Sequence, residues 1–171
     1  MLGKLDKIWY IIASNQKTFY TQEVEDPVFK INLLRTESPT IFQVIEKFKK
    51  NGYYMEKVFE IQSMDPKSLT LEYKQFLGLQ KRRIMLYLNN EASMLLWYEV
   101  SSPKNQHVLH LLADIPHPPL SEIILFKNFL LNSLKTITPS NYILKPCTQR
   151  SEKTDEKTLF NFFSHTEVGN L

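Results

Sequence analysis

Two adjacent arginines are the side chains of this sequence with the clearest capacity for chemistry. The chain has four arginines in all, and Arg82 and Arg83 stand together at the start of an apolar run. Successive residues of a strand face opposite sides of a sheet, so Arg82 would share one face with Ile84, and Arg83 the other with Met85. Both faces are apolar, which predicts that at least one guanidinium points into a covered space. A cation there is costly unless an anion meets it, and that anion is either a protein carboxylate or a ligand.

Each arginine also has a purely structural explanation. Asparagine tolerates positive φ, so Asn89-Asn90 between two strand-like runs predicts a tight hairpin turn. A two-residue turn would place Trp97 across from Arg82, where a guanidinium can stack on the indole. Arg83 would then have Glu99 as an available partner. The residues alone do not decide between these structural roles and a ligand site.

No other motif of known chemistry is present. The sequence contains no P-loop, dinucleotide fingerprint, nucleophile elbow or Cys/His metal spacing. His107 and His110 lie three residues apart, but only Asp114 stands near enough to add a ligand, which indicates surface histidines and no metal site. Cys147 is the single cysteine, so it excludes an internal disulfide and is interpreted as a buried or half-buried thiol in a reducing compartment.

Composition narrows the class of protein. A chain of 171 residues suits a single domain over 1–171, and 43% hydrophobic with 23% charged residues is ordinary for a soluble globular protein. The formal charge of +3 is too small to indicate a nucleic-acid partner. No apolar segment reaches the roughly 20 residues of a membrane span, and the N-terminal residues do not resemble a signal or transit peptide. The sequence does not indicate an oligomeric state.

Helices and strands must position the arginines. Apolar residues at helical spacing predict helices over 4–13, 108–112 and 120–135, and Ser38-Pro39 is typical of the start of another helix that Asn51-Gly52 would end. Strand-like runs cover 28–34, 53–64, 69–77, the arginine hairpin, 141–145 and 158–164. This order predicts an α+β domain, an antiparallel sheet of about six strands with flanking helices on one face.

Several short motifs, taken in their order, resemble a known family. They are Ile8-Trp9, Leu33-Leu34, Ser38-Pro39-Thr40, Arg82-Arg83, Pro119-Leu120 and the closing run Leu159–Ser164. Together they resemble the chorismate pyruvate-lyase (4-hydroxybenzoate synthase) family, especially its short cyanobacterial and plastid-type branch. The resemblance implies a lyase that converts chorismate to 4-hydroxybenzoate and pyruvate without metal or organic cofactor. It also implies a location in the plastid stroma or the bacterial cytoplasm.

The resemblance assigns a role to particular residues. Arg83 matches the arginine that binds the ring carboxylate of the aromatic or pre-aromatic ligand, and Arg82 is its neighbour in the site. Asn161 stands where the family has a catalytic glutamate, and asparagine can neither act as a base nor carry charge. The remaining substrate-binding positions implied by the family are Ser38, Thr40, Leu120 and Arg150.

Three functional hypotheses follow. The first is a carbon–oxygen lyase acting on chorismate, with Arg83 as the anchor for the carboxylate. The second is a non-catalytic small-molecule-binding module of the same fold, which the substitution at Asn161 favours. The third is an interaction protein whose arginines are structural, which an acidic partner for Arg83 would favour.

Overall fold

The protein is mostly β structure. The computed structural model describes residues 2–20, 24–37, 39–63, 70–74, 81–102, 106–133 and 144–147. The elements in chain order are the 3-10 helix η1 (Leu2–Leu5), β1 (Lys7–Ser14), α1 (Lys17–Tyr20), β2 (Val24–Arg35), β3 (Thr40–Lys50), β4 (Tyr53–Ser63), β5 (Thr70–Lys74), β6 (Lys81–Leu88), β7 (Met94–Ser102), β8 (Gln106–Ala113), α2 (Leu120–Ser133) and β9 (Lys145–Pro146). No helix among these described residues is long and apolar enough to cross a membrane.

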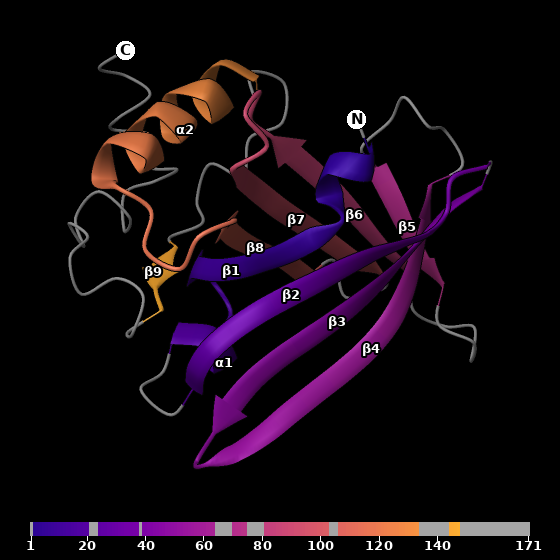
Figure 1. The fold of residues 1–171 in the computed structure, drawn as a ribbon, viewed down its shortest axis with the longest axis horizontal. Coiled ribbons are helices and arrows are strands. Elements are labelled where there is room, and N and C mark those ends of the chain that lie inside the picture. The colour runs from indigo at the N-terminus through magenta and orange to yellow at the C-terminus, as the bar shows by residue number, and fades with distance from the viewer. Residues whose placement is uncertain are drawn as a thin grey trace.

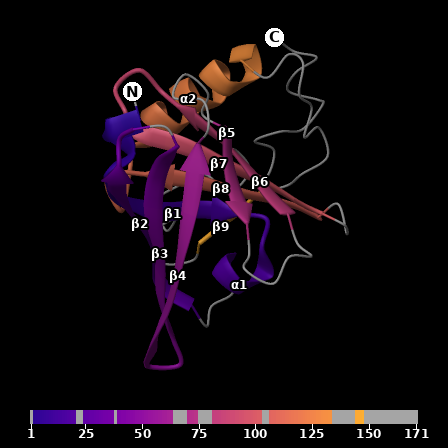
Figure 2. The same ribbon diagram turned by 90° about the vertical axis from the view of Figure 1, so that its right-hand side faces the viewer.

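The sheet curls until its two ends meet. Nine strands form one antiparallel sheet in the order β2-β3-β4-β5-β6-β7-β8-β1-β9, and β1 also pairs with β2. The first half of β1 pairs with β2 from Lys7 to Tyr10, and its second half pairs with β8 from Tyr10 to Ser14. As a result, β2–β4 run across the direction of β7 and β8 on the far side of the molecule (Figures 1 and 2). The result is a curled, barrel-like sheet with an inside and an outside.

The inside of the curled sheet is a dense apolar core. Strand alternation directs every second side chain inward, as Thr40, Phe42 and Val44 of β3 show by being buried. At one end, η1 closes over the core, where the indole nitrogen of Trp9 donates a hydrogen bond to the carbonyl oxygen of Leu5 at 3.0 Å. Both of these residues are fully buried. This end of the sheet is therefore filled by side chains.

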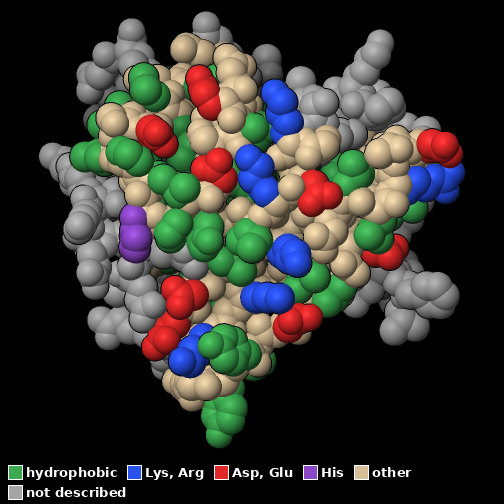
Figure 3. Space-filling view, viewed as in Figure 1, with side chains coloured by type: hydrophobic (Ala, Val, Ile, Leu, Met, Phe, Trp, Pro, Cys, Tyr) green, Lys and Arg blue, Asp and Glu red, His purple; other side chains and the backbone are tan. Residues whose placement is uncertain are grey.

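Helix α2 lies on the outer surface of the sheet (Figure 1). Its buried residues Ile123, Phe126 and Leu130 belong to a second cluster that includes Leu96 of β7 and Leu109 of β8. Strands β7 and β8 are consequently buried on both faces, one toward the interior and the other beneath α2. The side of the sheet formed by β1–β4 instead carries mixed charged and apolar side chains (Figure 3).

The predicted α+β fold with about six strands is wrong. The helix predicted over 4–13 is strand β1, the helix predicted after Ser38-Pro39 is strand β3, and the helix predicted over 108–112 is strand β8. In β3 the apolar residues also fit helical spacing, but eleven residue pairs join this strand to β4. Backbone hydrogen bonds to β4 along the whole of β3 stabilise the strand, and the spacing of apolar residues within β3 does not indicate that pairing.

Some of the predicted elements are present. The helix predicted over 120–135 is α2, and the strands predicted over 53–64 and 69–77 correspond to β4 and β5. The strand predicted over 158–164 lies outside the described residues, as does most of the one predicted over 141–145, where β9 is described at Lys145–Pro146.

The turn of the arginine hairpin is longer than predicted. Strand β6 ends at Leu88 and β7 begins at Met94, so residues 89–93 form a five-residue connection in place of a two-residue turn. The side-chain oxygen of Asn89 accepts hydrogen bonds from the backbone nitrogens of Ser93 and Met94 at 2.9 and 3.0 Å. Asn89 therefore holds the loop together by bonding the backbone across it. The consequence is a different register, in which Trp97 lies opposite Leu86.

Candidate ligand-binding site

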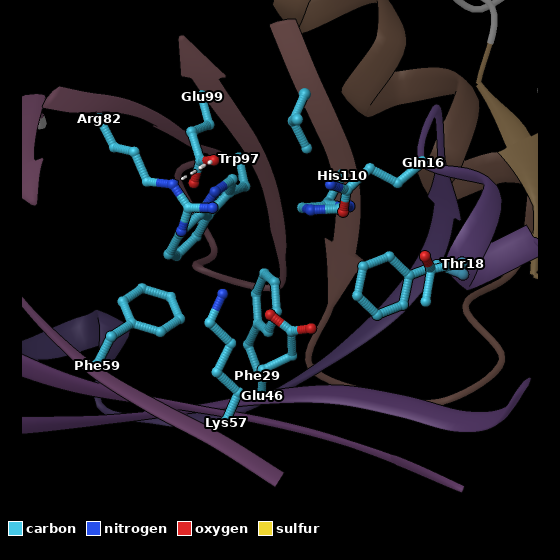
Figure 4. A pocket seen from close by; sticks show the side chains of 12 residues that line it. Gln16, Thr18, Phe29, Glu46, Lys57, Phe59, Arg82, Trp97, Glu99 and His110 are labelled. Atoms are coloured by element: carbon cyan, nitrogen blue, oxygen red, sulfur yellow. Dashed lines mark ion pairs between the residues drawn. The ribbon is translucent and has the colours of Figure 1, made fainter. Parts of the chain in front are cut away.

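A small cavity opens into the barrel, and Figure 4 shows the side chains that line it. Its volume is ≈ 140 Å³. Strands β2–β4 and β6–β8, with the segment around α1, supply its walls. The lining residues are Gln16, Thr18, Phe19, Phe29, Glu46, Lys57, Phe59, Arg82, Trp97, Glu99, Val108 and His110. Four of these are acidic or basic, in an interior that is otherwise largely apolar.

The register of the hairpin decides which arginine enters the barrel. Arg82 lies on the inward face of β6 with Ile84 and lines the cavity, whereas Arg83 lies on the other face and is exposed. The prediction that Arg83 occupies the covered position is therefore wrong. The prediction failed because both faces of the strand are apolar, and only the curvature of the sheet decides which face lies inside the barrel. Ile84 is fully buried in the core of the barrel, which fixes Arg82 on that side.

A protein carboxylate meets the inward arginine. The Nε atom of Arg82 lies 3.6 Å from an Oε atom of Glu99. Glu99 is buried, with only 8% of its surface exposed. Glu99 lies two residues after Trp97 in β7 and therefore shares its inward face. Both residues line the same cavity as Arg82. The sequence had suggested Glu99 as a partner for Arg83, and the structure assigns it to Arg82.

A second pair of opposite charges sits across the cavity on neighbouring strands. Glu46 of β3 and Lys57 of β4 are register partners, and both line the cavity (Figure 4). No ion pair joins them within the described residues. Burial raises the pKa of the Glu46 carboxyl above its usual value; Lys57 opposes that rise, Glu99 adds to it and Arg82 opposes it. The neutral form of Glu46 is thus more accessible than that of an exposed glutamate.

His110 contributes a neutral imidazole to the cavity wall. Its Nδ1 atom lies 2.8 Å from the hydroxyl oxygen of Ser14, and that oxygen also accepts a hydrogen bond from the backbone nitrogen of Gln16 at 3.0 Å. The rings of Phe19 and Phe29 stand edge-on to the imidazole at centroid distances of 5.1 and 5.3 Å. Burial lowers the pKa of His110 to about 3, so the ring is uncharged at neutral pH. The interpretation of His110 as a surface residue is wrong, because it is 3% exposed.

The other sequence-predicted site residues do not gather at this cavity. Thr40 is buried at the start of β3, where its hydroxyl donates a hydrogen bond to the carbonyl oxygen of Thr36 at 3.3 Å. Leu120 is the half-buried first residue of α2, on the outside of the barrel. Ser38, Arg150 and Asn161 lie outside the described residues. Of the predicted residues within the described part of the chain, Arg82 alone lines the cavity.

Sequence reasoning missed Glu46, Lys57 and His110. The signal for Glu46 is strand alternation. Phe42, Val44 and Glu46 share one face of β3 once the segment is interpreted as a strand, and Phe42 and Val44 are apolar. For His110 the equivalent signal is the apolar run of β8 on either side of it. Across the described residues, no group of three or more His, Cys, Asp or Glu side chains could hold a metal ion.

Comparison with known proteins identifies the fold. No protein-family model and no curated protein matches the sequence. A solved structure described by the words "The Siderocalin Ex-FABP functions through dual ligand specificities" is similar to this chain with a TM-score of 0.57. The similarity covers 76% of this chain and 87% of that chain at 10% sequence identity, so it bears on the fold alone.

The structural similarity overturns the chorismate-lyase resemblance. A curled, mostly β sheet with one long helix outside it takes the place of a flat α+β sheet flanked by helices, so the family, its lyase activity and the carboxylate-binding role assigned to Arg83 in that fold are all wrong. The short motifs that suggested the family have the same order along a chain that folds differently. The chain resembles the siderocalin of that structure in fold.

Proposed function

We propose that this protein binds a small molecule in the charged cavity at the open end of its barrel. The observation that carries the proposal is the placement of Glu46, Lys57, Arg82 and Glu99 around one cavity at the open end of an otherwise apolar barrel. Glu99 is buried, Glu46 and Arg82 are half-buried, and Lys57 is exposed. Charged groups in such a position lower the stability of the folded protein unless they are paired, so proteins tend to keep them where they serve a ligand. Small barrels of this kind have room for one small ligand.

The size of the cavity suits a single ring. Its volume is ≈ 140 Å³, and an apolar protein cavity of about 150 Å³ is known to admit one benzene molecule. The rings of Phe29 and Phe59 lie 4.9 and 6.4 Å from that of Trp97, measured between centroids, so aromatic rings form part of a wall that is otherwise polar. A flat ring would pack on these surfaces.

The basic side chains favour a carboxylate on that ring. The guanidinium of Arg82 and the ammonium of Lys57 both line the cavity, and Figure 4 shows the two side chains directed toward the same space. A guanidinium can bind a carboxylate through two parallel hydrogen bonds. The ligand class that this geometry supports is therefore a small aromatic carboxylate.

Three ligands of one shape test this function. Benzoate, benzamide and benzamidine are flat single rings that differ in charge, and quenching of tryptophan fluorescence reports binding because Trp97 lines the cavity. We expect saturable binding of benzoate that is tighter than that of benzamide. A charge-assisted hydrogen bond is worth about 1.5–3 kcal/mol, so removing the arginine should weaken benzoate binding roughly 10- to 150-fold.

A matched pair of variants separates the site from the rest of the strand. The double variant Arg82→Gln/Glu99→Gln removes both members of the partly buried ion pair and leaves no orphaned charge. The control Arg83→Gln changes the exposed neighbour on the other face of β6. Benzoate affinity should fall in the double variant and stay unchanged in the control. Equal losses in both, or the absence of saturable binding by all three ligands to the wild-type protein, would contradict the proposed function.

A further inference from the structure

Two polar groups in the cavity have no hydrogen-bond partner, among the described residues, on the side that faces it. Glu46 makes no hydrogen bond or ion pair within the described residues, and His110 makes its one hydrogen bond through Nδ1, to Ser14. Polar groups removed from water are normally paired, and here His110 is buried and Glu46 is half-buried. Both groups line the same cavity, and Figure 4 shows the imidazole projecting from β8 toward the space that Glu46 borders from β3. The carboxyl of Glu46 and the second ring nitrogen of His110 therefore indicate which hydrogen-bonding groups a ligand must carry.

The hydroxyl of Ser14 fixes the hydrogen on His110. Ser14 is fully buried, and its oxygen already accepts a hydrogen bond from the backbone nitrogen of Gln16. Its own hydroxyl hydrogen needs an acceptor, and Nδ1 of His110 at 2.8 Å is the acceptor that the described residues provide. The neutral imidazole therefore carries its hydrogen on Nε2. His110 presents a donor to the cavity and keeps it across the physiological pH range.

Donors outnumber acceptors around the cavity. Arg82 from β6, Lys57 from β4 and the Nε2–H of His110 from β8 can donate, while Glu99 from β7 is engaged by Arg82. Glu46 from β3 is the remaining charged acceptor, Gln16 and Thr18 at the start of α1 can each donate or accept, and β2 contributes the uncharged ring of Phe29. With both glutamates ionised, the four charged side chains sum to zero. With Glu46 protonated they sum to +1, and Glu99 is the one anion left among them.

We infer that the cavity binds an organic monoanion whose carboxylate accepts a hydrogen bond from protonated Glu46 and meets the cation of Arg82, so that each ligand binds together with one proton. This inference rests on the proposed function, and it adds that Glu46 binds the ligand's carboxylate in its protonated form. A cationic ligand would instead need ionised Glu46 and would lie against Arg82 and Lys57, which repel it. The proton balances because the carboxyl hydrogen comes from solvent and stays on Glu46 in the complex.

Proton uptake is the direct measurement. Benzoate is titrated calorimetrically into the wild-type protein between about pH 5.5 and 8, where benzoate remains ionised, in buffers of different ionisation enthalpy. We expect uptake approaching one proton per benzoate at the upper end of that range. The dissociation constant should rise about tenfold per pH unit once the pH exceeds the pKa of Glu46 in the free protein.

The variant Glu46→Gln gives the matched test, because glutamine keeps a donor at all pH values. Its benzoate affinity should be nearly independent of pH, with no proton uptake. The control Glu60→Gln alters an exposed glutamate of β4 and should keep the wild-type pH dependence. In the wild-type protein, carboxyl ¹³C resonances of labelled glutamate give a second measurement that needs no substitution: benzoate should move the titration of one glutamate to higher pH.

The outcomes separate the two claims. Benzoate binding without proton uptake, a wild-type pH slope that survives in Glu46→Gln, or a glutamate titration that benzoate leaves unmoved would overturn this inference and leave small-molecule binding standing. Benzamidine binding that tightens as the pH rises would also overturn it, in favour of a cationic ligand. Failure of benzoate, benzamide and benzamidine alike would overturn the proposed function and this inference with it.

Discussion

Replacement of His110 should remove a large part of the acid sensitivity of this fold. Burial lowers the pKa of His110 from 6.5 to about 3. The unfolded chain therefore binds a proton on this residue at pH values where the folded protein does not. The sign follows directly: folded stability is complete above the unfolded pKa and is lost as the pH falls through 6.5 toward 3.

The magnitude follows from the same two values. Each pH unit inside that window costs about 1.4 kcal/mol of the free energy of unfolding. Between pH 7.5 and pH 5, the contribution of His110 alone amounts to roughly 2 kcal/mol. That is a substantial share of the total stability of a small domain, which is about 5–15 kcal/mol.

The assay is urea unfolding followed by circular dichroism at a series of pH values. The variant His110→Gln has no titrating ring, so the difference in stability between wild type and variant should change by roughly 2 kcal/mol across the interval. His117→Gln, which alters an exposed histidine, serves as the control and should keep the wild-type profile. If His110→Gln loses stability in parallel with the wild type as the pH falls, the buried neutral state of this imidazole is refuted.

Three further predictions concern stability. Arg82→Leu leaves Glu99 without its partner and should cost about 2–4 kcal/mol in chemical unfolding, whereas Arg82→Leu/Glu99→Leu should recover most of that loss; no recovery would argue against their pairing. Asn89→Ala removes two hydrogen bonds to the backbone of the β6–β7 loop and should lower the urea midpoint by an amount equivalent to about 1–3 kcal/mol, while Asn90→Ala, at an exposed position, should lie within about 0.5 kcal/mol of wild type. Phe126→Ala opens a void beneath α2, where this side chain is 2% exposed, and should cost about 3–5 kcal/mol; a loss no greater than that of Leu125→Ala, at 68% exposure, would contradict the packing of α2 on the sheet.

Local sequence signals predicted the outer helix well. Pro118-Pro119 precedes α2, and buried residues recur along one face at Ile123, Phe126 and Leu130. Those features depend on residues close together in the chain, and a helix satisfies its own backbone hydrogen bonds. Its prediction therefore required no knowledge of the rest of the fold.

The same local signals misassigned β3 and the turn after it. Ile41, Val44, Ile45 and Phe48 have helical spacing, and Asn51-Gly52 was interpreted as the end of that helix. In the structure Asn51 and Gly52 both have positive φ, of 51° and 81°, and close a two-residue hairpin between Lys50 and Tyr53. Asn-Gly between two apolar runs is the strongest short-range hairpin signal. As the turn of a hairpin, Asn51-Gly52 makes the preceding segment a strand, and strand alternation then places Glu46 on the inward face.

The site itself was half accessible to sequence reasoning. The argument that an arginine on this hairpin must meet an anion is correct for Arg82, and its partner is Glu99. The choice between the two arginines required knowing which face of β6 is concave, and that depends on how the whole sheet curls. His110 and Ser14 are 96 positions apart in sequence, so no local pattern connects them.

Strand β1 divides its pairing between two neighbours, and this arrangement has a consequence for how the protein is made. The second half of β1 pairs with residues 110–113 of β8, about a hundred positions later in the chain. During synthesis, β2–β4 can pair with one another long before β8 has left the ribosome, but that edge of β1 must wait. Such late, non-local pairing slows folding and leaves an unpaired strand edge on the nascent chain, where it can recruit other chains. A chain interrupted before residue 106 would hold the aromatic walls of the cavity but lack β8, the strand that closes the sheet against β1.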